Sequence, residues 1–276
     1  MKKLPKLNPQ VIRQFRKKIY DFYRKHGREL PWRNTTDPYE ILVSEIMLQQ
    51  TQALRVIEKY KQFIHTFPHI ESLARSSLLD IMKVWQGLGY NRRALALKKL
   101  AEIAVSQYDG KIPSSVEALK ALPGIGGATA HAICAFAFNQ PTTFIETNIR
   151  SVFIHHFFRN RDDIKDGEIL PLIANTIDTK NPRIWYYALM DYGAALKQKH
   201  DNPGRRSTHY KKQSSFKGSN RQIRGIILKE LVKKPKIYES SLFKKLNFDK
   251  DRVKEILKQL NEEGFILKEG TFITIR

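Results

Sequence analysis

The feature that most constrains the fold is an almost uninterrupted helical periodicity between Asn8 and about Lys199. Apolar residues recur every three to four positions, the spacing of a helix with one buried face. The clearest examples are VIRQFRKKIYDFYRKH, ILVSEIMLQQTQALRVIEKYKQFI and LLDIMKVWQGL. Short breaks rich in proline, glycine or asparagine separate such segments, and no run of alternating strand residues interrupts them. The pattern predicts an all-α domain over residues 1–199.

The net charge points to a polyanionic partner. The chain of 276 residues carries 49 lysines and arginines against 27 acidic residues, a formal charge of +22. Such an excess favours nucleic acid over an anionic membrane, a ribosome or a merely basic soluble protein. No apolar stretch is long enough to cross a bilayer, and the basic N-terminus lacks the apolar core of a signal peptide. We therefore expect a cytoplasmic monomer, associated with the nucleoid if bacterial, with no membrane partner.

A change of composition predicts a linker and a second, smaller domain. Residues 200–220 are basic and poor in apolar side chains, which predicts a linker that contacts the nucleic-acid backbone. Residues 221–276 contain three amphipathic helical segments followed by FILKEGTFITIR, which alternates on both sides of Glu269-Gly270 as a hairpin does. Three helices closed by a hairpin predict a winged-helix-like α+β domain. Such domains commonly bind duplex DNA, and some bind protein, so both alternatives stay open.

The string LPGIGGATA, from Leu122 to Ala130, lies between two helical segments. Gly124 and Gly126 let the backbone turn sharply and approach a ligand without interference from a Cβ atom. The amides at the start of the second helix then point outward, where a phosphate oxygen accepts from them. The string therefore predicts a helix-hairpin-helix, with Leu122, Gly124 and Gly126 at one DNA phosphate. Whether a monovalent cation binds the hairpin carbonyls is left open.

About twenty residues later, FIETNIR places one carboxylate, Glu146, between apolar neighbours and a polar turn. Together with LPWR, SEIMLQQTQ and WQGLGYNRRA, these strings resemble the helix-hairpin-helix DNA glycosylases of the endonuclease III superfamily, in particular the adenine DNA glycosylase branch. The similarity runs from about Leu30 to Gly193, with the motifs in the order of the family. The resemblance implies a helix-hairpin-helix glycosylase fold. It also implies double-stranded DNA as the partner, and release of adenine mispaired with 8-oxoguanine or guanine.

Two glutamates are the candidate catalytic acids. Cleavage of a purine glycosidic bond needs one acid that protonates the departing base and one carboxylate that stabilises positive charge on the sugar. Glu45 lies in an apolar helical segment, where burial would raise its pKa and keep it protonated. The alternative is a carboxylate on an exposed helix face. By resemblance Glu45 is the family's general acid.

Glu146 stands at the position of the family's catalytic aspartate, so its side chain is longer by one methylene. The resemblance assigns Asn148 to catalysis and Arg150 to DNA contact. The alternative for Glu146 is a helix cap. A pocket rebuilt around the longer acid and an altered or weakened activity are both compatible with the exchange.

Two other departures change the expected chemistry. Ala128, in the predicted DNA contact of the hairpin, stands where lyase-competent relatives have a nucleophilic lysine, so a monofunctional enzyme is expected. Many members hold an iron–sulfur cluster with four cysteines, whereas this chain has the single Cys134. We therefore expect no cluster and no other cofactor. The eight histidines show no metal-binding spacing, so no metal site is predicted.

Four further residues are expected to read DNA. Gln50 and Thr51 match family residues that contact the base opposite the target. Leu88 and Tyr90 match residues that enter the base stack when the target base is flipped out. A tight exposed turn with apolar groups suits such a wedge, and ordinary packing at a helix end is the alternative.

The leading hypothesis is a monofunctional DNA glycosylase of base-excision repair that hydrolyses the glycosidic bond of a flipped base. One alternative is a mismatch glycosylase that acts on thymine or uracil. Another is a non-catalytic protein that binds DNA structures and keeps only the scaffold. Glu45 argues against this last alternative, because a mere binder has no need of a half-buried acid.

Overall fold

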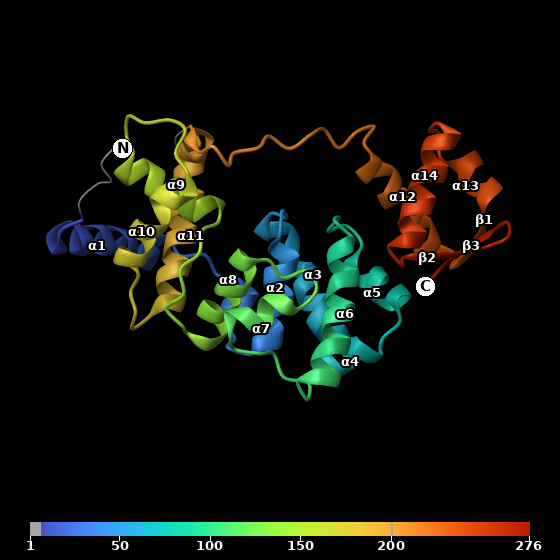
Figure 1. Cartoon of the computed structure of the whole chain (residues 1–276), viewed down its shortest axis with the longest axis horizontal. Coiled ribbons are helices and arrows are strands. Elements are labelled where there is room, and N and C mark those ends of the chain that lie inside the picture. The colour runs from blue at the N-terminus through green and yellow to red at the C-terminus, as the bar shows by residue number, and fades with distance from the viewer. Residues whose placement is uncertain (1–6, 200) are drawn as a thin grey trace. The chain divides into compact units, whose positions relative to one another are not determined.

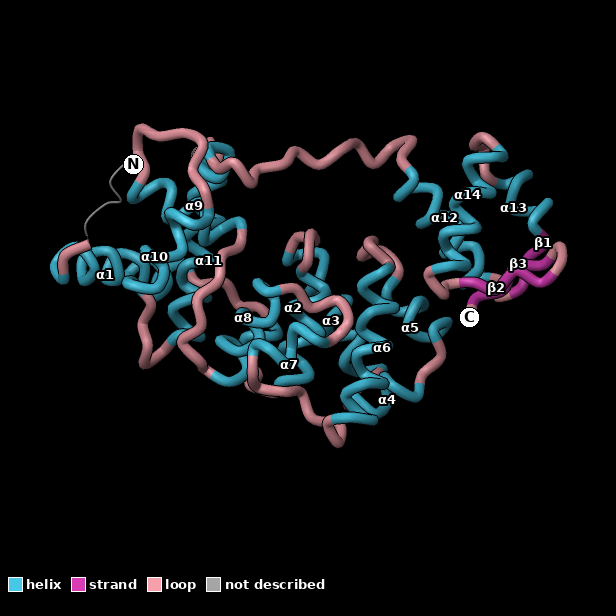
Figure 2. Tube along the Cα trace, in the orientation of Figure 1, coloured by secondary structure: helices cyan, strands magenta, loops and turns pink. Residues whose placement is uncertain are grey.

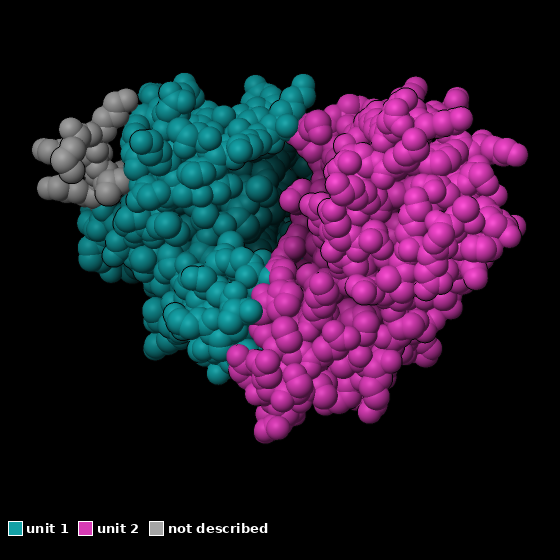
Figure 3. Space-filling view, turned by 45° about the vertical axis from the view of Figure 1, so that its right-hand side comes forward, with its two compact units in different colours: residues 1–45, 113–121, 125–212 teal, residues 46–112, 122–124, 213–276 magenta. Residues whose placement is uncertain are grey.

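The computed structural model describes residues 7–199 and 201–276, and these are mostly helical (Figure 1, Figure 2). The chain divides into two compact units (Figure 3). The first comprises residues 1–45, 113–121 and 125–212, and the second residues 46–112, 122–124 and 213–276. Each unit is therefore assembled from segments that lie far apart in the sequence. Within the described residues, no helix combines the length and the apolar character that a bilayer span requires.

The first unit is built mainly of helices. It contains α1 (Pro9–His26), η1 (Pro31–Arg33), α2 (Pro38–Leu48, whose last three residues belong to the second unit), α7 (Val116–Ala121), α8 (Gly127–Phe138), α9 (Thr147–Phe157), α10 (Asp166–Thr176), α11 (Pro182–Lys199) and η2 (Pro203–Arg206). The ring of Phe15 on α1 meets Phe153 of α9 and Trp185 of α11 edge-on, at centroid distances of 5.5 and 5.9 Å. This aromatic core fixes α9, whose first residues carry the candidate site.

One glycine sets the spacing between α9 and α11. A Cβ atom added at Gly193 would lie 2.4 Å from the carbonyl oxygen of Asn148, a distance that side chains do not tolerate. Only glycine lets α11 approach the first turn of α9 so closely. The backbone that follows Glu146 is thereby held against α11.

The second unit consists of a helical part and a C-terminal module, residues 220–276. It contains α3 (Ala53–Thr66), α4 (Ile70–Arg75), α5 (Leu78–Trp85), α6 (Arg92–Gln107), α12 (Asn220–Lys233), β1 (Lys236–Tyr238), α13 (Glu239–Lys245), α14 (Lys250–Glu262), β2 (Ile266–Glu269) and β3 (Phe272–Ile275). The antiparallel sheet has the order β1-β3-β2, with Ile237 opposite Ile273 and Leu267 opposite Thr274. The prediction of helices closed by a hairpin is confirmed. Strand β1 was not predicted, because three residues are too few to show alternation.

The C-terminal module is tied to α6 by a shared carboxylate. Glu263 lies 2.6 Å from Arg92 of α6 and 2.5 Å from Arg224 of α12. Helix α12 also packs against α5. The module of residues 220–276 is thus attached to the helical part of its own unit by packing and by ion pairs.

Part of the predicted linker is folded. Its expected first residue, 200, lies outside the described residues, and Pro203, Gly204 and Ser207 are buried. The reason is Arg206, whose guanidinium donates to the carbonyl oxygens of Ile154, Phe158, Arg159 and Arg161 at the end of α9. Residues 208–218 are exposed and have no helix or strand, as a linker does.

Candidate active site

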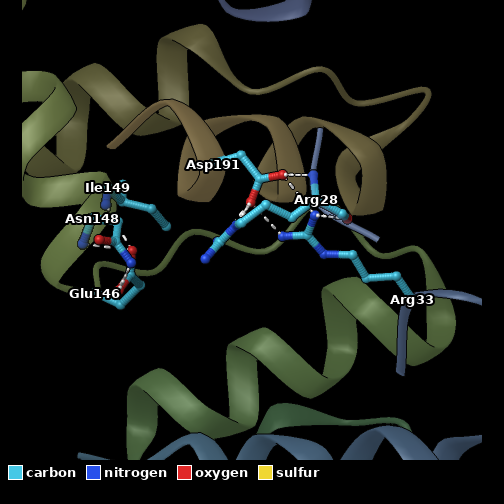
Figure 4. A network of polar contacts seen from close by, with 6 residues as sticks. All are labelled: Arg28, Arg33, Glu146, Asn148, Ile149 and Asp191. Carbon is cyan, nitrogen blue, oxygen red and sulfur yellow. Dashed lines mark hydrogen bonds and ion pairs between the residues drawn. The ribbon is translucent and has the colours of Figure 1, made fainter. Parts of the chain in front are cut away.

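Glu146 caps α9 with its side chain (Figure 4). Its Oε1 atom accepts from the backbone amides of Asn148 and Ile149, both at 2.7 Å, and Oε2 accepts from the side-chain amide of Asn148 at 3.2 Å. The helix cap considered as an alternative is therefore present. A carboxylate held by backbone amides at a helix N-terminus is also a fixed negative charge, because the helix dipole stabilises it there. The cap and an electrostatic role are compatible.

The carboxyl group of Glu45 has a raised pKa and holds its proton at neutral pH. It lies near the end of α2, with Leu42, Ser44 and Ile46 buried around it. Burial raises the pKa of Glu45 to about 8; the negative charge of Glu146 adds to the rise, and the positive charge of Arg33 opposes it. A carboxyl group with this pKa is mostly protonated at neutral pH and can give up a proton. The charge of Glu146 acts on the carboxyl group of Glu45, which places the two side chains near each other.

Arg33, whose positive charge acts on Glu45, belongs to a buried ion-pair network (Figure 4). Asp191 of α11 is 3% exposed and binds both nitrogens of the Arg33 fork at 2.8 Å. It also accepts from the amide and guanidinium of Arg28 at 2.7 and 2.6 Å. Burial alone would raise the pKa of Asp191, but the hydrogen bonds and charges of Arg33 and Arg28 outweigh it, so its pKa lies below the ordinary value. The guanidinium of Arg33 in turn lies 4.5 Å from the ring centre of Tyr187.

Two other cations lie near the start of α9. Arg150 forms a two-pronged ion pair with Asp166, with both distances 2.7 Å, and its side chain is 14% exposed. This pairing stabilises the fold, and the DNA contact expected of Arg150 stays a prediction. Lys197 of α11 is half-buried; burial lowers the pKa of its ammonium group, and the charge of Glu146 opposes that shift.

The predicted hairpin is present, with the turn residues Leu122–Gly124 in the second unit and α7 and α8 in the first. Gly124 has a φ of +80°, and a Cβ atom there would lie 2.8 Å from Ala96, so the turn requires glycine. Leu122 is buried, whereas Gly126 and Ala128 are exposed at the beginning of α8. No side chain caps α8. The phosphate contact expected at its first amides stays a prediction.

Two turns of the second unit carry the remaining predicted DNA readers. Gln50 is exposed, and Thr51 is partly exposed, in the turn between α2 and α3. Leu88 is only 2% exposed. The expectation of an exposed apolar wedge is therefore wrong for Leu88, which packs inside the unit. Tyr90 is partly exposed, and its hydroxyl accepts from Arg221 of α12 at 3.0 Å.

The iron–sulfur cluster of many relatives does not fit this chain. Such clusters are held by cysteine thiolates, four in the usual case. The chain has one cysteine, Cys134, buried in α8 with its thiol bonded to the carbonyl of Ser114 at 3.3 Å. In the part of the chain that the structure describes, no group of three or more His, Cys, Asp and Glu side chains could hold a metal.

Several residues of the site were not singled out from the sequence. Arg33 and Asp191 stand in the strings LPWR and ALMDYGAAL, where a charge among apolar residues signals burial with a partner. That signal does not say which partner it is. Gly193 and Lys197 gave no signal of their own.

The chain is similar to known base excision repair proteins. Residues 43–170 match the family model of the HhH-GPD superfamily base excision DNA repair protein. An adenine DNA glycosylase of Buchnera aphidicola subsp. Baizongia pistaciae is 39% identical over 187 residues, 66% of this chain and 52% of that protein. The adenine DNA glycosylase of Mus musculus is 32% identical over 67% of this chain and 38% of that protein.

One solved structure, a thermostable thymine-DNA glycosylase, superposes with a TM-score of 0.59 at 27% identity, over 66% of this chain and 86% of the other. Residues 43–170 and these relatives support the HhH-GPD superfamily of base excision DNA repair proteins as the family of the chain. The curated relatives that it matches are named adenine DNA glycosylases. It spans about half the length of the curated relatives first matched.

Proposed function

We propose that the protein is a monofunctional DNA glycosylase that hydrolyses the glycosidic bond of adenine mispaired with 8-oxoguanine or guanine. The observation that carries the proposal is the pair of unlike glutamates. Glu45 keeps a proton up to about pH 8, and Glu146 is a carboxylate held by two backbone amides. Purine release needs both kinds of group.

The proposed reaction uses each group once. The Glu45 carboxyl donates its proton to a ring nitrogen of the adenine, and the bond between that base and C1′ of the sugar breaks with both electrons going to the base. Positive charge then develops on the sugar, and the Glu146 carboxylate stabilises it. Water adds at C1′ and loses a proton, which leaves an abasic site and free adenine. Ala128 has no amine, so no covalent adduct at the position of the lyase lysine is part of this reaction.

The proposed partner is double-stranded DNA, and no cofactor is included. The exposed amides at the start of α8 and the net charge of +22 support phosphate binding. Basic side chains of residues 208–218 and of the C-terminal module are proposed to add backbone contacts. A protein partner for that module is the alternative.

A glycosylase assay with labelled duplexes tests the proposal. The panel includes adenine opposite 8-oxoguanine, guanine and cytosine, and thymine or uracil opposite guanine. We expect release of adenine from the first two, with strand breaks only after alkali and no adduct trapped by borohydride. Thymine is included because the chain is 27% identical to a thymine-DNA glycosylase. Faster release of thymine or uracil would replace the adenine assignment, and binding without any release would leave only the non-catalytic alternative.

The pKa of Glu45 predicts the pH dependence of catalysis. As pH rises through about 8, the general acid loses its proton, so the single-turnover rate should fall, by about tenfold per pH unit once the pH is well above the pKa. Duplex binding is measured at each pH to separate chemistry from affinity. A rate that stays constant or rises between pH 7 and about 9.5 would exclude Glu45 as the proton donor.

A further inference from the structure

Arg93 of α6 is a buried cation that connects two turns of the second unit. It is 8% exposed. Its Nη1 atom donates to the carbonyl oxygens of Ile46, Met47 and Gln49 at 3.0, 2.7 and 2.6 Å. Its other nitrogens donate to the hydroxyl of Thr51 at 3.1 Å, and to the carbonyls of Gly89 and Tyr90 at 3.0 and 3.3 Å. One guanidinium therefore holds the end of α2, the turn after it and the turn before α6.

Each of the two turns contains one residue with an unfavourable backbone conformation. Gln50 has a φ of +56° and Tyr90 a φ of +47°, in the left-handed region that is unfavourable for a non-glycine residue. Such conformations persist only where the surrounding contacts enforce them. Arg93 bonds the carbonyls of Gln49 and Gly89, the residues directly before these two. It therefore contributes to holding both conformations.

Among the described residues, no carboxylate forms an ion pair with Arg93. Its hydrogen-bond partners are the carbonyls at the negative end of α2, the carbonyls of Gly89 and Tyr90, and one hydroxyl. Its guanidinium also lies over the rings of Trp85 and Tyr90, whose centres are 5.5 and 5.4 Å away. Burying an arginine only to stabilise the fold is expensive. Both of its turns carry residues expected to read DNA, which gives this burial a functional reason.

We infer that Arg93 is a positioning residue for mispair recognition. It holds Gln50 and Thr51 in place for the base opposite the target, and Tyr90 in place for the gap that a flipped base leaves. The inference about Arg93 depends on the proposed function in one respect, namely that the ligand is mispaired duplex DNA. A lysine cannot replace Arg93, because one ammonium group cannot span acceptors on two turns as a guanidinium fork does.

The test compares Arg93→Lys with Arg92→Lys, a matched control in which the neighbouring, exposed cation keeps its charge. Binding is measured by fluorescence anisotropy on duplexes with 2′-fluoro-2′-deoxyadenosine, which resists cleavage, opposite 8-oxoguanine or opposite thymine. We expect Arg93→Lys to reduce the preference for the mispair about tenfold, with affinity for the matched duplex unchanged. Arg92→Lys should keep the wild-type preference. An unchanged preference in folded Arg93→Lys, or an equal loss for both duplexes, would refute the inference.

A second measurement covers the case in which Arg93→Lys does not fold. Hydrogen exchange of the wild-type chain is followed by mass spectrometry, with and without the mispaired duplex, on peptides covering residues 48–52 and 87–91. The two turns should gain protection together; protection of only one would overturn the inference. Failure of the proposed function is distinguishable, because it would show as mispair binding with no adenine released from the cleavable duplex.

Discussion

Replacement of Glu146 by glutamine should reduce the single-turnover rate of adenine release by about a thousandfold or more while duplex binding stays within about twofold. The amide oxygen of glutamine can still accept from the amides of Asn148 and Ile149, so the cap of α9 is retained. What is lost is the negative charge that stabilises the sugar cation. The measurement is a rate with enzyme in excess over the mispaired duplex, beside a binding isotherm.

Glu58→Gln is the matched control, because its side chain is 80% exposed on α3 and its ion pair with Lys61 is also exposed. It should behave as the wild type. Glu146→Asp tests the length of the glutamate side chain. Aspartate also caps helices, but its carboxylate lies one methylene closer to the backbone. We therefore expect a single-turnover rate about tenfold to a hundredfold lower. A wild-type rate for Glu146→Gln would remove Glu146 from the mechanism. A faster Glu146→Asp would mean that the site is not rebuilt around glutamate.

Asp191→Asn should lower the free energy of unfolding by about 3–5 kcal/mol. Asp191 is almost fully buried and neutralises Arg28 and Arg33, of which Arg33 is itself 7% exposed. Asparagine removes the charge and turns an amide donor toward two guanidinium donors. Urea unfolding followed by circular dichroism at fixed pH measures the change.

Asp80→Asn provides the comparison, because its pair with Lys83 is half-exposed on both sides. Exposed pairs contribute about 0–1 kcal/mol, so this variant should unfold nearly as the wild type does. A loss below about 1 kcal/mol in Asp191→Asn would mean that water reaches the network and that the ion pairs are not structurally important.

The sequence predicted the local features of this molecule well. Helical periodicity, the glycines of the hairpin and the alternation of the C-terminal hairpin all depend on neighbouring residues. The partial burial of Glu45 was predictable for the same reason, since its apolar neighbours lie within one turn. Leu88 shows the limit: a Gly-Leu-Gly-Tyr string indicates a tight turn, but it does not say which side chain faces inward.

The contacts that organise the site are long-range. Arg33 and Asp191 are 158 positions apart, and Arg93 reaches carbonyls more than 40 positions earlier in the chain. Each arginine stands in a string that resembles the family, yet its role follows only from the carboxylates and carbonyls that folding brings to it. The cap formed by Glu146 is a local contact, but it was an open alternative because the side-chain conformation decides it.

The proton held by Glu45 has a consequence for the stability of the whole protein. The unfolded chain loses that proton near the ordinary pKa of 4.5, whereas the folded chain keeps it to about pH 8. Stability rises with pH only where the unfolded state binds more protons, and here the folded state does. The contribution of this proton to the free energy of unfolding is therefore complete below pH 4.5 and is lost as pH rises through about 8. The folded protein should withstand more urea at about pH 6 than at about pH 9, and Glu45→Gln should narrow that difference. The raised pKa of Glu45 that serves catalysis therefore also limits the alkaline range in which the fold survives.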